Sequence, residues 1–195
     1  MPPGKLATIR ARQSENKRVA EPPQFAARSR EALRRRYRPA SIRLLFIGEA
    51  PPASGRFFYR GDSGLYRAMR EAFTAADPRF DSPDFLAAFR DSGCYLIDLC
   101  PDPVDRLPAS ERLAARIAAE GRLARTLRRL RPQSIAILLR SIEPNVWRAA
   151  ALANWTGAAI CLPYPGRWSG HKKVFAAGLA AHLADGCRLD LTAAG

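Results

Sequence analysis

From residue 42 onward, short apolar runs alternate with longer segments that carry apolar residues at helical spacing. The apolar runs predict four strands, over 42–47, 94–100, 134–139 and 158–162, of which the first is expected to be buried. The helical spacing predicts helices over 65–75, 109–130, 143–155 and 171–185, and a short helix after Asp81 with Ser82 as its N-cap. Strands that alternate with helices run parallel and are covered on both faces. We therefore expect an α/β fold of three layers, α/β/α, around a central, mainly parallel four-stranded sheet.

The first 40 residues differ in composition from the rest of the chain. They are rich in Arg, Pro, Ala and Gln and hold few large apolar residues. We therefore expect residues 1–40 to form a basic arm, in which 24–36 can form a short helix. Residues 41–195 then form the folded domain, because a chain of 195 residues suits one domain better than two.

The remaining composition limits location and cofactors. No apolar stretch approaches the roughly 20 residues that span a membrane, and the N-terminus does not resemble a signal peptide. A cytoplasmic protein is therefore expected. The four cysteines, Cys94, Cys100, Cys161 and Cys187, form no C-x-x-C pair, so we expect free thiols rather than metal ligands.

Net charge indicates the class of partner. The chain has 32 Lys and Arg against 18 Asp and Glu, a net charge of +14, and arginine predominates. Small, strongly basic domains commonly bind polyanions, and arginine binds phosphate in a bidentate manner. A nucleic acid is the expected partner, with a merely solvated basic surface as the alternative. No basic amphipathic helix has a bulky aromatic face, which argues against a membrane surface.

Three loops that follow predicted strands carry the candidate chemistry. In a parallel sheet, ligands bind beyond the carboxyl ends of the strands, where these loops meet. Glu49 comes directly after the first strand, Asp98 lies near the end of the second, and residues 163–169 follow the fourth. The aromatic triplet 57–59 can provide a face on which a base stacks. The alternative is that Phe57 or Phe58 belongs to the core and that Glu49 only caps a helix.

Four segments of the chain form an ordered set of motifs. They are Gly48-Glu49-Ala50-Pro51 with Gly55-Arg56-x-Phe58, then Tyr95-Leu96-Ile97-Asp98, then 103–132, and finally Leu162-Pro163-Tyr164-Pro165-Gly166. Together they resemble the uracil-DNA glycosylases, especially the iron–sulfur branch, and the likeness covers about residues 42–184. It implies a DNA-repair enzyme that flips uracil or a related damaged base out of DNA and hydrolyses its N-glycosidic bond.

The resemblance implies a role for each matching residue. Glu49 would activate water at the anomeric carbon of the sugar and stabilise the positive charge that develops there. Phe58 would stack on the flipped base, and the backbone around Gly48 and Ala50 would help to hold that base. The loop of Tyr164 would press on the minor groove and stabilise the departing base.

Basic residues beside these loops are the expected DNA contacts. Arg167 and Trp168 can act as a wedge that fills the gap left by the flipped base, although Trp168 can equally pack on the domain. Phosphate contacts are expected from the N-terminal arm and from Arg56, Arg60, Arg167, Ser169, Lys172 and Lys173. A solvated face is expected for the arginines of the long helix, Arg116, Arg122, Arg125, Arg128 and Arg129.

The chain departs from the family pattern at three places. Asp98 stands where the family usually has asparagine. Its carboxylate can accept from uracil N3–H, but it presents a second acceptor to O4 unless it carries a proton. Asp98 can therefore act in recognition, in catalysis or in the structure of the loop. If Asp98 lies close to Glu49, one of the two should have a raised pKa. Tyr164 replaces a histidine, for which His171 can substitute in catalysis unless it lies at the surface. No cysteine set matches the cluster ligands, so no iron–sulfur cluster, metal or other cofactor is expected.

Three functions stay open on this reasoning. The first is a DNA glycosylase, which we expect to act as a monomer. The second is a non-catalytic protein that binds damaged or single-stranded DNA on the same scaffold, because a fold does not fix a function. The third is a small-molecule hydrolase that uses Glu49 and Asp98 as paired carboxylates, for which DNA would be irrelevant and salt would have little effect.

Overall fold

A four-stranded parallel sheet forms the centre of the fold. The computed structural model describes residues 23–165 and 169–184. Its strands are β1 (Leu44–Gly48), β2 (Cys94–Asp98), β3 (Ser134–Ile137) and β4 (Ala158–Cys161), in the order β2-β1-β3-β4. Every neighbouring pair is parallel, which confirms the predicted α/β fold and makes the sheet entirely rather than mainly parallel.

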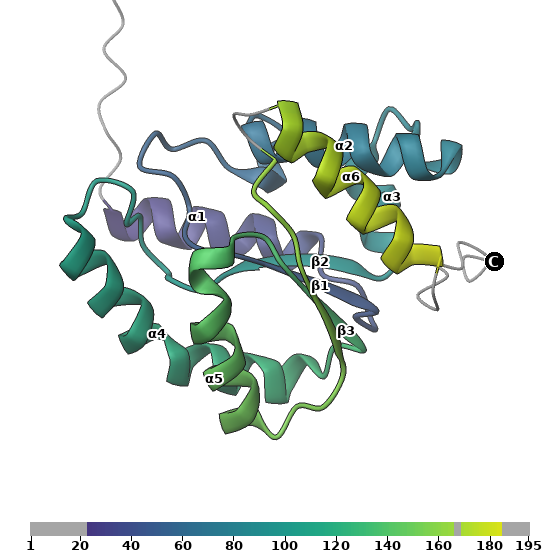
Figure 1. Ribbon diagram of the computed structural model, residues 1–195. Coiled ribbons are helices and arrows are strands. Elements are labelled where there is room, and N and C mark those ends of the chain that lie inside the picture. The colour runs from purple at the N-terminus through teal and green to yellow at the C-terminus, as the bar shows by residue number, and fades with distance from the viewer. Residues whose placement is uncertain (1–22, 166–168, 185–195) are drawn as a thin grey trace, which may run out of the picture.

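Six α-helices surround this sheet in the described part of the chain. They are α1 (Pro23–Arg36), α2 (Gly64–Ala76), α3 (Phe85–Asp91), α4 (Ala109–Leu130), α5 (Glu143–Ala153) and α6 (Ser169–Ala184). Figure 1 shows α4 and α5 packed together on one face of the sheet and α2, α3 and α6 on the other. This arrangement is the predicted three-layer order. Within the described ranges, no helix is long and apolar enough to cross a membrane.

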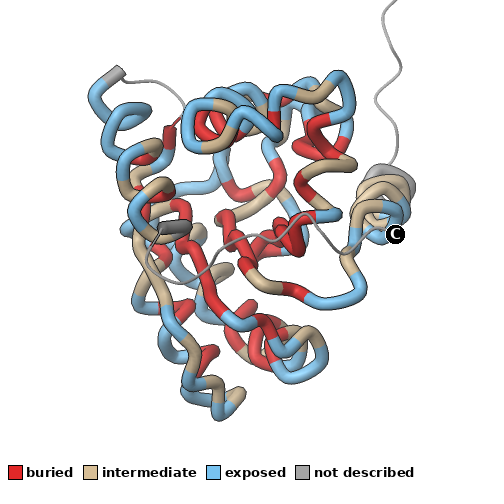
Figure 2. The backbone as a smooth tube through the Cα atoms, turned by 90° about the vertical axis from the view of Figure 1, so that its right-hand side faces the viewer, coloured by how far each residue is buried: buried red, intermediate tan, exposed pale blue. Residues whose placement is uncertain are grey.

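Strands β1, β2 and β3 are buried because helices cover both faces of the sheet, whereas no residue of the edge strand β4 is fully buried. All five residues of β1 are buried, as are all five of β2. Figure 2 shows the buried stretches of the backbone gathered in the interior and the exposed stretches mostly around the outside. On the side of α2 and α3, the core is aromatic: the Phe73 ring centroid lies 5.5 Å from that of Phe89 and 4.8 Å from that of Phe80. The apolar residues at helical spacing in α2 face this core: Met69, Ala72 and Phe73 are buried, and Leu65 packs against the core while partly buried.

One predicted helix cap is wrong. The helix α3 is capped by Asp84, whose carboxylate accepts from the Ala87 backbone N–H at 3.0 Å. Ser82 instead accepts from the backbone N–H of Asp84 at 3.2 Å. Its hydroxyl therefore closes a local turn, and the helix begins after that turn.

The first helix of the chain packs on the domain. The short helix expected within the arm is present as α1, and Leu33 and Tyr37 at its C-terminal end contact the core. The Tyr37 ring stacks on that of Tyr59, with the ring centroids 5.6 Å apart. The Tyr95 hydroxyl of the edge strand β2 donates to the Arg34 carbonyl at 3.4 Å, so α1 lies beside β2, and a cavity separates α1 from α4. The expected arm before residue 23 lies outside the described residues.

Candidate functional site

A cavity of about 450 Å³ opens where β1 and β2 end. The parallel register pairs Gly48 with Asp98, so the last residues of these two strands lie side by side. The loop after β1, the loop before α4 and the segment after β4 complete the walls. Seven of the residues predicted to act in catalysis, base binding or DNA binding line this cavity: Gly48, Glu49, Ala50, Arg56, Phe58, Asp98 and Tyr164.

The Glu49 carboxylate is held by two arginines of α4. Its Oε1 accepts from Arg112 Nε at 2.6 Å and from Arg116 Nε at 2.6 Å, and Oε2 accepts from Arg112 Nη2. The two arginines are four residues apart, so they share one face of the helix. Only 11% of the Glu49 side chain is exposed. Glu49 is therefore a fixed anion at the end of β1 rather than a helix cap.

These contacts set the charge of Glu49. Burial on its own raises the pKa of this carboxyl, but the hydrogen bonds and positive charges of Arg116 and Arg112 outweigh burial, so the pKa is lowered. Glu49 is consequently ionised at neutral pH. A permanent negative charge in a largely buried position suits the stabilisation of a developing positive charge on a ligand.

Asp98 is buried at the end of β2, with 9% of its surface exposed. Its Oδ2 accepts from Arg34 Nη2 of α1 at 2.8 Å, and Arg122 Nη2 donates to the Asp98 carbonyl at 2.7 Å. Burial raises the pKa of Asp98, and the charges of Arg34 and Arg122 oppose that rise. The raised pKa expected for a close carboxylate pair is present, but burial causes it, and Glu49 is not among its causes.

Phe58 is both a core residue and a wall of the cavity. It is 3% exposed, and its ring packs against Tyr59 at 5.0 Å and Phe89 at 5.4 Å between centroids. Phe57 is 2% exposed. The alternative that these rings belong to the core is therefore correct, while Phe58 still meets the space in which a ligand would lie.

Tyr164 and His171 occupy different places. Tyr164 follows β4, lines the cavity and is 41% exposed. Partial burial and then the charge of Asp98 raise its pKa, so its hydroxyl keeps its proton at neutral pH and can donate a hydrogen bond. His171 is exposed on α6 and is not among the residues that line this cavity. Of the two candidates for the replaced histidine, Tyr164 is the one at the cavity.

The expected DNA-binding residues are only partly brought together. Arg56 is exposed and lines the cavity. Arg60 is exposed and donates to the Gly55 carbonyl of its own loop at 3.1 Å, and Lys172 pairs with Glu71 at 3.2 Å. Lys173 is exposed on α6. Ser169 is the first residue of this helix. The predicted wedge, Arg167 and Trp168, lies outside the described residues.

The sequence prediction for the long helix is wrong at two positions. Arg116 and Arg122 were expected on a solvated face, yet Arg116 is 12% exposed at its side chain and Arg122 reaches the carbonyls that follow β2. Buried acceptors at the strand ends draw them inward. Arg125, Arg128 and Arg129 are exposed as expected. Arg34 and Arg112 were not predicted at all, although the spacing of Arg112 and Arg116 on one helix face was a usable sign.

The glycine before Glu49 is expected to be intolerant of a side chain. A methyl group at Gly48 would lie 3.0 Å from Asp98 Oδ1, whose partner oxygen is fixed by Arg34. Gly48→Ala should therefore destabilise the protein by about 1 kcal/mol, as overpacking does. Gly64, at the start of α2, has open space at this position, and Gly64→Ala should stabilise by about 0.5–1 kcal/mol. Urea denaturation of both variants tests this, and effects of the same sign would contradict it.

Comparison with known proteins finds no family model and no curated protein that matches this chain. In the described part of the chain, no cluster of three or more His, Cys, Asp or Glu side chains could hold a metal ion. Cys94, Cys100 and Cys161 form no disulfide there, and Cys187 lies outside it. The polar side chains of Glu49, Asp98 and Tyr164 are the reactive groups that the first cavity brings together.

Proposed function

We propose that the protein is a DNA glycosylase that hydrolyses the N-glycosidic bond of uracil or a related damaged base. The observation that carries the proposal is the cavity at the ends of β1 and β2. It gathers Glu49, Phe58, Asp98 and Tyr164 from segments far apart in the chain. These are the positions whose motifs resemble the uracil-DNA glycosylases, in the order in which those motifs occur.

The size and walls of the cavity suit a flipped base. Sites for small ligands commonly occupy about 300–1,000 Å³ and combine apolar walls with a few polar groups. This cavity has about 450 Å³, with Phe58, Leu65 and Leu138 among its apolar walls. A base must leave the helical stack to reach such a site, at a cost of a few kcal/mol. Contacts with the walls and polar groups would offset this cost.

The chemistry follows from the charges of the side chains. As the bond to the base breaks, positive charge develops on the sugar, and the ionised Glu49 stabilises it. Water adds to the anomeric carbon and gives up a proton, while the bonding electrons leave with the base, which takes up a proton. Tyr164, protonated at neutral pH, donates a hydrogen bond to an oxygen of the departing base. Asp98 accepts from a ring N–H of that base.

The positive charge of the chain supports a DNA substrate. A net charge of +14 favours contact with the phosphate backbone, and Arg56 at the cavity rim is exposed for such a contact. Binding through phosphates should weaken steeply as salt is added. The small-molecule hydrolase considered above has no comparable need for this charge.

One observation favours a second candidate, a non-catalytic DNA-binding protein. Both carboxylate oxygens of Glu49 are occupied by arginines, and Oε1 accepts from two of them. A carboxylate held in this way is a weaker base for activating water than one with a free oxygen. On this reading the cavity would receive a damaged base without cleaving it.

The proposal is tested by measuring release of the free base. The full chain is incubated with labelled single-stranded and duplex oligonucleotides that contain uracil, hypoxanthine or only normal bases, and the free base is quantified chromatographically. The glycosylase account predicts release of a non-standard base together with an alkali-sensitive abasic site. Binding to these oligonucleotides without release of any base would instead support the second candidate.

A further inference from the structure

A second cavity, of about 360 Å³, lies between α1 and α4 beside β2. Tyr95 and Ile97 of β2 form its floor, so it runs along the side of the edge strand rather than across the strand ends. Among the described residues that line the two cavities, Asp98 alone lines both. The second cavity is thus a separate space, and the first site does not explain why these residues line it.

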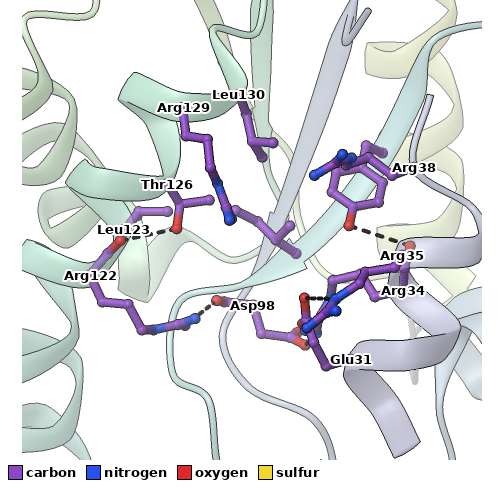
Figure 3. Close-up of a pocket in the computed structure, with 12 residues that line it drawn as sticks. Glu31, Arg34, Arg35, Arg38, Asp98, Arg122, Leu123, Thr126, Arg129 and Leu130 are labelled. Atoms are coloured by element: carbon purple, nitrogen blue, oxygen red, sulfur yellow. Dashed lines mark hydrogen bonds and ion pairs between the residues drawn. The ribbon is translucent and has the colours of Figure 1, made fainter. Parts of the chain in front are cut away.

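The walls of this cavity are strongly basic. Figure 3 shows side chains from α1 and α4 that point toward the space between the two helices. Two carboxylates, Glu31 and Asp98, face it. Three unbalanced positive charges remain, because the lining includes five arginines: Arg34, Arg35, Arg38, Arg122 and Arg129.

The two carboxylates are already engaged with α1. Glu31 accepts from Arg34 at 3.0 Å and pairs with Arg35 at 3.5 Å, and Asp98 pairs with Arg34 at 2.8 Å. Neither Arg38 nor Arg129 makes a side-chain hydrogen bond or ion pair with any described residue. Two arginines that face the cavity therefore have no acceptor in that part of the chain.

Donors within the cavity walls are also left without acceptors. The Nε atoms of Arg34 and Arg122 are buried and have no hydrogen-bond partner in the described part of the chain. Their guanidinium groups thus hold positive charge in a partly buried position, and an anion in the cavity would stabilise that charge. The positive charges also repel one another: burial, and then the charge of Arg34, lower the pKa of Arg122.

We propose that this cavity binds a phosphate group of a free small molecule, of the size of pyrophosphate or a nucleotide. Guanidinium groups bind phosphate oxygens in a bidentate manner, and several around one anion compensate both its charge and its lone pairs. The volume lies at the small end of the range of ligand sites, which suits a compact anion. Because the cavity flanks β2 and not the strand ends, the ligand is a free phosphate compound rather than the DNA strand. This site does not depend on the proposed function.

Inorganic pyrophosphate is the probe that tests this site. The full chain is titrated with it by isothermal calorimetry at low salt, beside the double variant Arg38→Gln/Arg129→Gln. These residues have no side-chain partners in the described structure, so their replacement should leave folding intact. Binding by the wild-type protein should weaken roughly tenfold or more in the double variant, since charged hydrogen bonds of this kind are lost.

A matched variant separates a built site from general charge. Arg67→Gln/Arg125→Gln removes the same charge from exposed positions that do not line the cavity, and pyrophosphate binding should change less than about twofold. No heat of binding in the wild-type protein, or an equal loss in both double variants, would overturn the proposal. So would displacement of pyrophosphate by a short oligonucleotide equally well with and without a 5′-phosphate, because the site would then belong to the DNA strand.

Discussion

Replacement of Glu49 by glutamine is expected to reduce base release by about 100-fold or more, the usual loss when a preorganised electrostatic contact to a transition state is removed. Glutamine keeps the shape of the side chain and can still accept from Arg112 or Arg116, but it lacks the negative charge that opposes the charge developing on the sugar. Affinity for DNA should remain within about threefold, since in the proposed reaction Glu49 would contact the sugar and not the phosphates. Single-turnover base release and DNA binding measured on one preparation test both parts.

The control for this variant is Glu111→Gln. Glu111 is exposed in the first turn of α4, one residue before Arg112, and its replacement removes the same charge without touching the cavity. Base release by this variant should equal that of the wild-type protein. Undiminished release by Glu49→Gln would mean that the carboxylate at the end of β1 has no part in the reaction.

Replacement of Asp98 by alanine is expected to destabilise the protein by about 3–5 kcal/mol, the range found when one partner of a buried ion pair is removed. Arg34, whose side chain is only 15% exposed, would lose its buried counter-charge. It would also remain close to the positive charge of the partly buried Arg122. Asp98→Asn should cost less, because an amide oxygen can still accept from Arg34. The measurement is the free energy of unfolding in urea.

A paired substitution distinguishes a poorly compensated charge from a lost contact. If the damage arises because Arg34 keeps only the half-exposed Glu31 as its partner, then Arg34→Met/Asp98→Leu should recover most of the stability lost in Asp98→Ala, since apolar replacement of a whole buried pair is often neutral. Asp91→Ala, which removes an exposed partner of Arg90, should cost less than about 1 kcal/mol. A cost below about 1 kcal/mol for Asp98→Ala as well would show that its ion pair adds nothing measurable to stability.

The fold was predictable because its strands are continuous apolar runs between amphipathic helices. Such runs are what a sheet covered on both faces requires, and the rule that parallel strands bring their carboxyl ends together placed Glu49 and Asp98 at one cavity. Strand lengths were less predictable: apolar residues such as Leu138 and Leu162 stay buried beyond the ends of β3 and β4. Burial alone therefore does not mark where a strand stops.

The arginines of the site were not predictable for a different reason. A helix with arginine on several faces gives no indication of which face meets the sheet, and the choice depends on contacts between distant segments. Arg116 meets Glu49 67 residues away in the sequence, and Arg34 meets Asp98 64 residues away. The polar and basic composition of the first 40 residues likewise gave no indication that Leu33 and Tyr37 pack α1 against the core.

The most direct test of the central claim is release of free uracil from a labelled single-stranded oligonucleotide, with the wild-type protein and Glu49→Gln compared at equal occupancy of the DNA. A glycosylase that depends on Glu49 should release uracil as the wild-type protein and lose nearly all release in the variant, although both bind the strand. Equal occupancy with no uracil released by either protein would contradict uracil as the substrate, and absence of release from every damaged base tried would leave a protein that binds DNA without cleaving it.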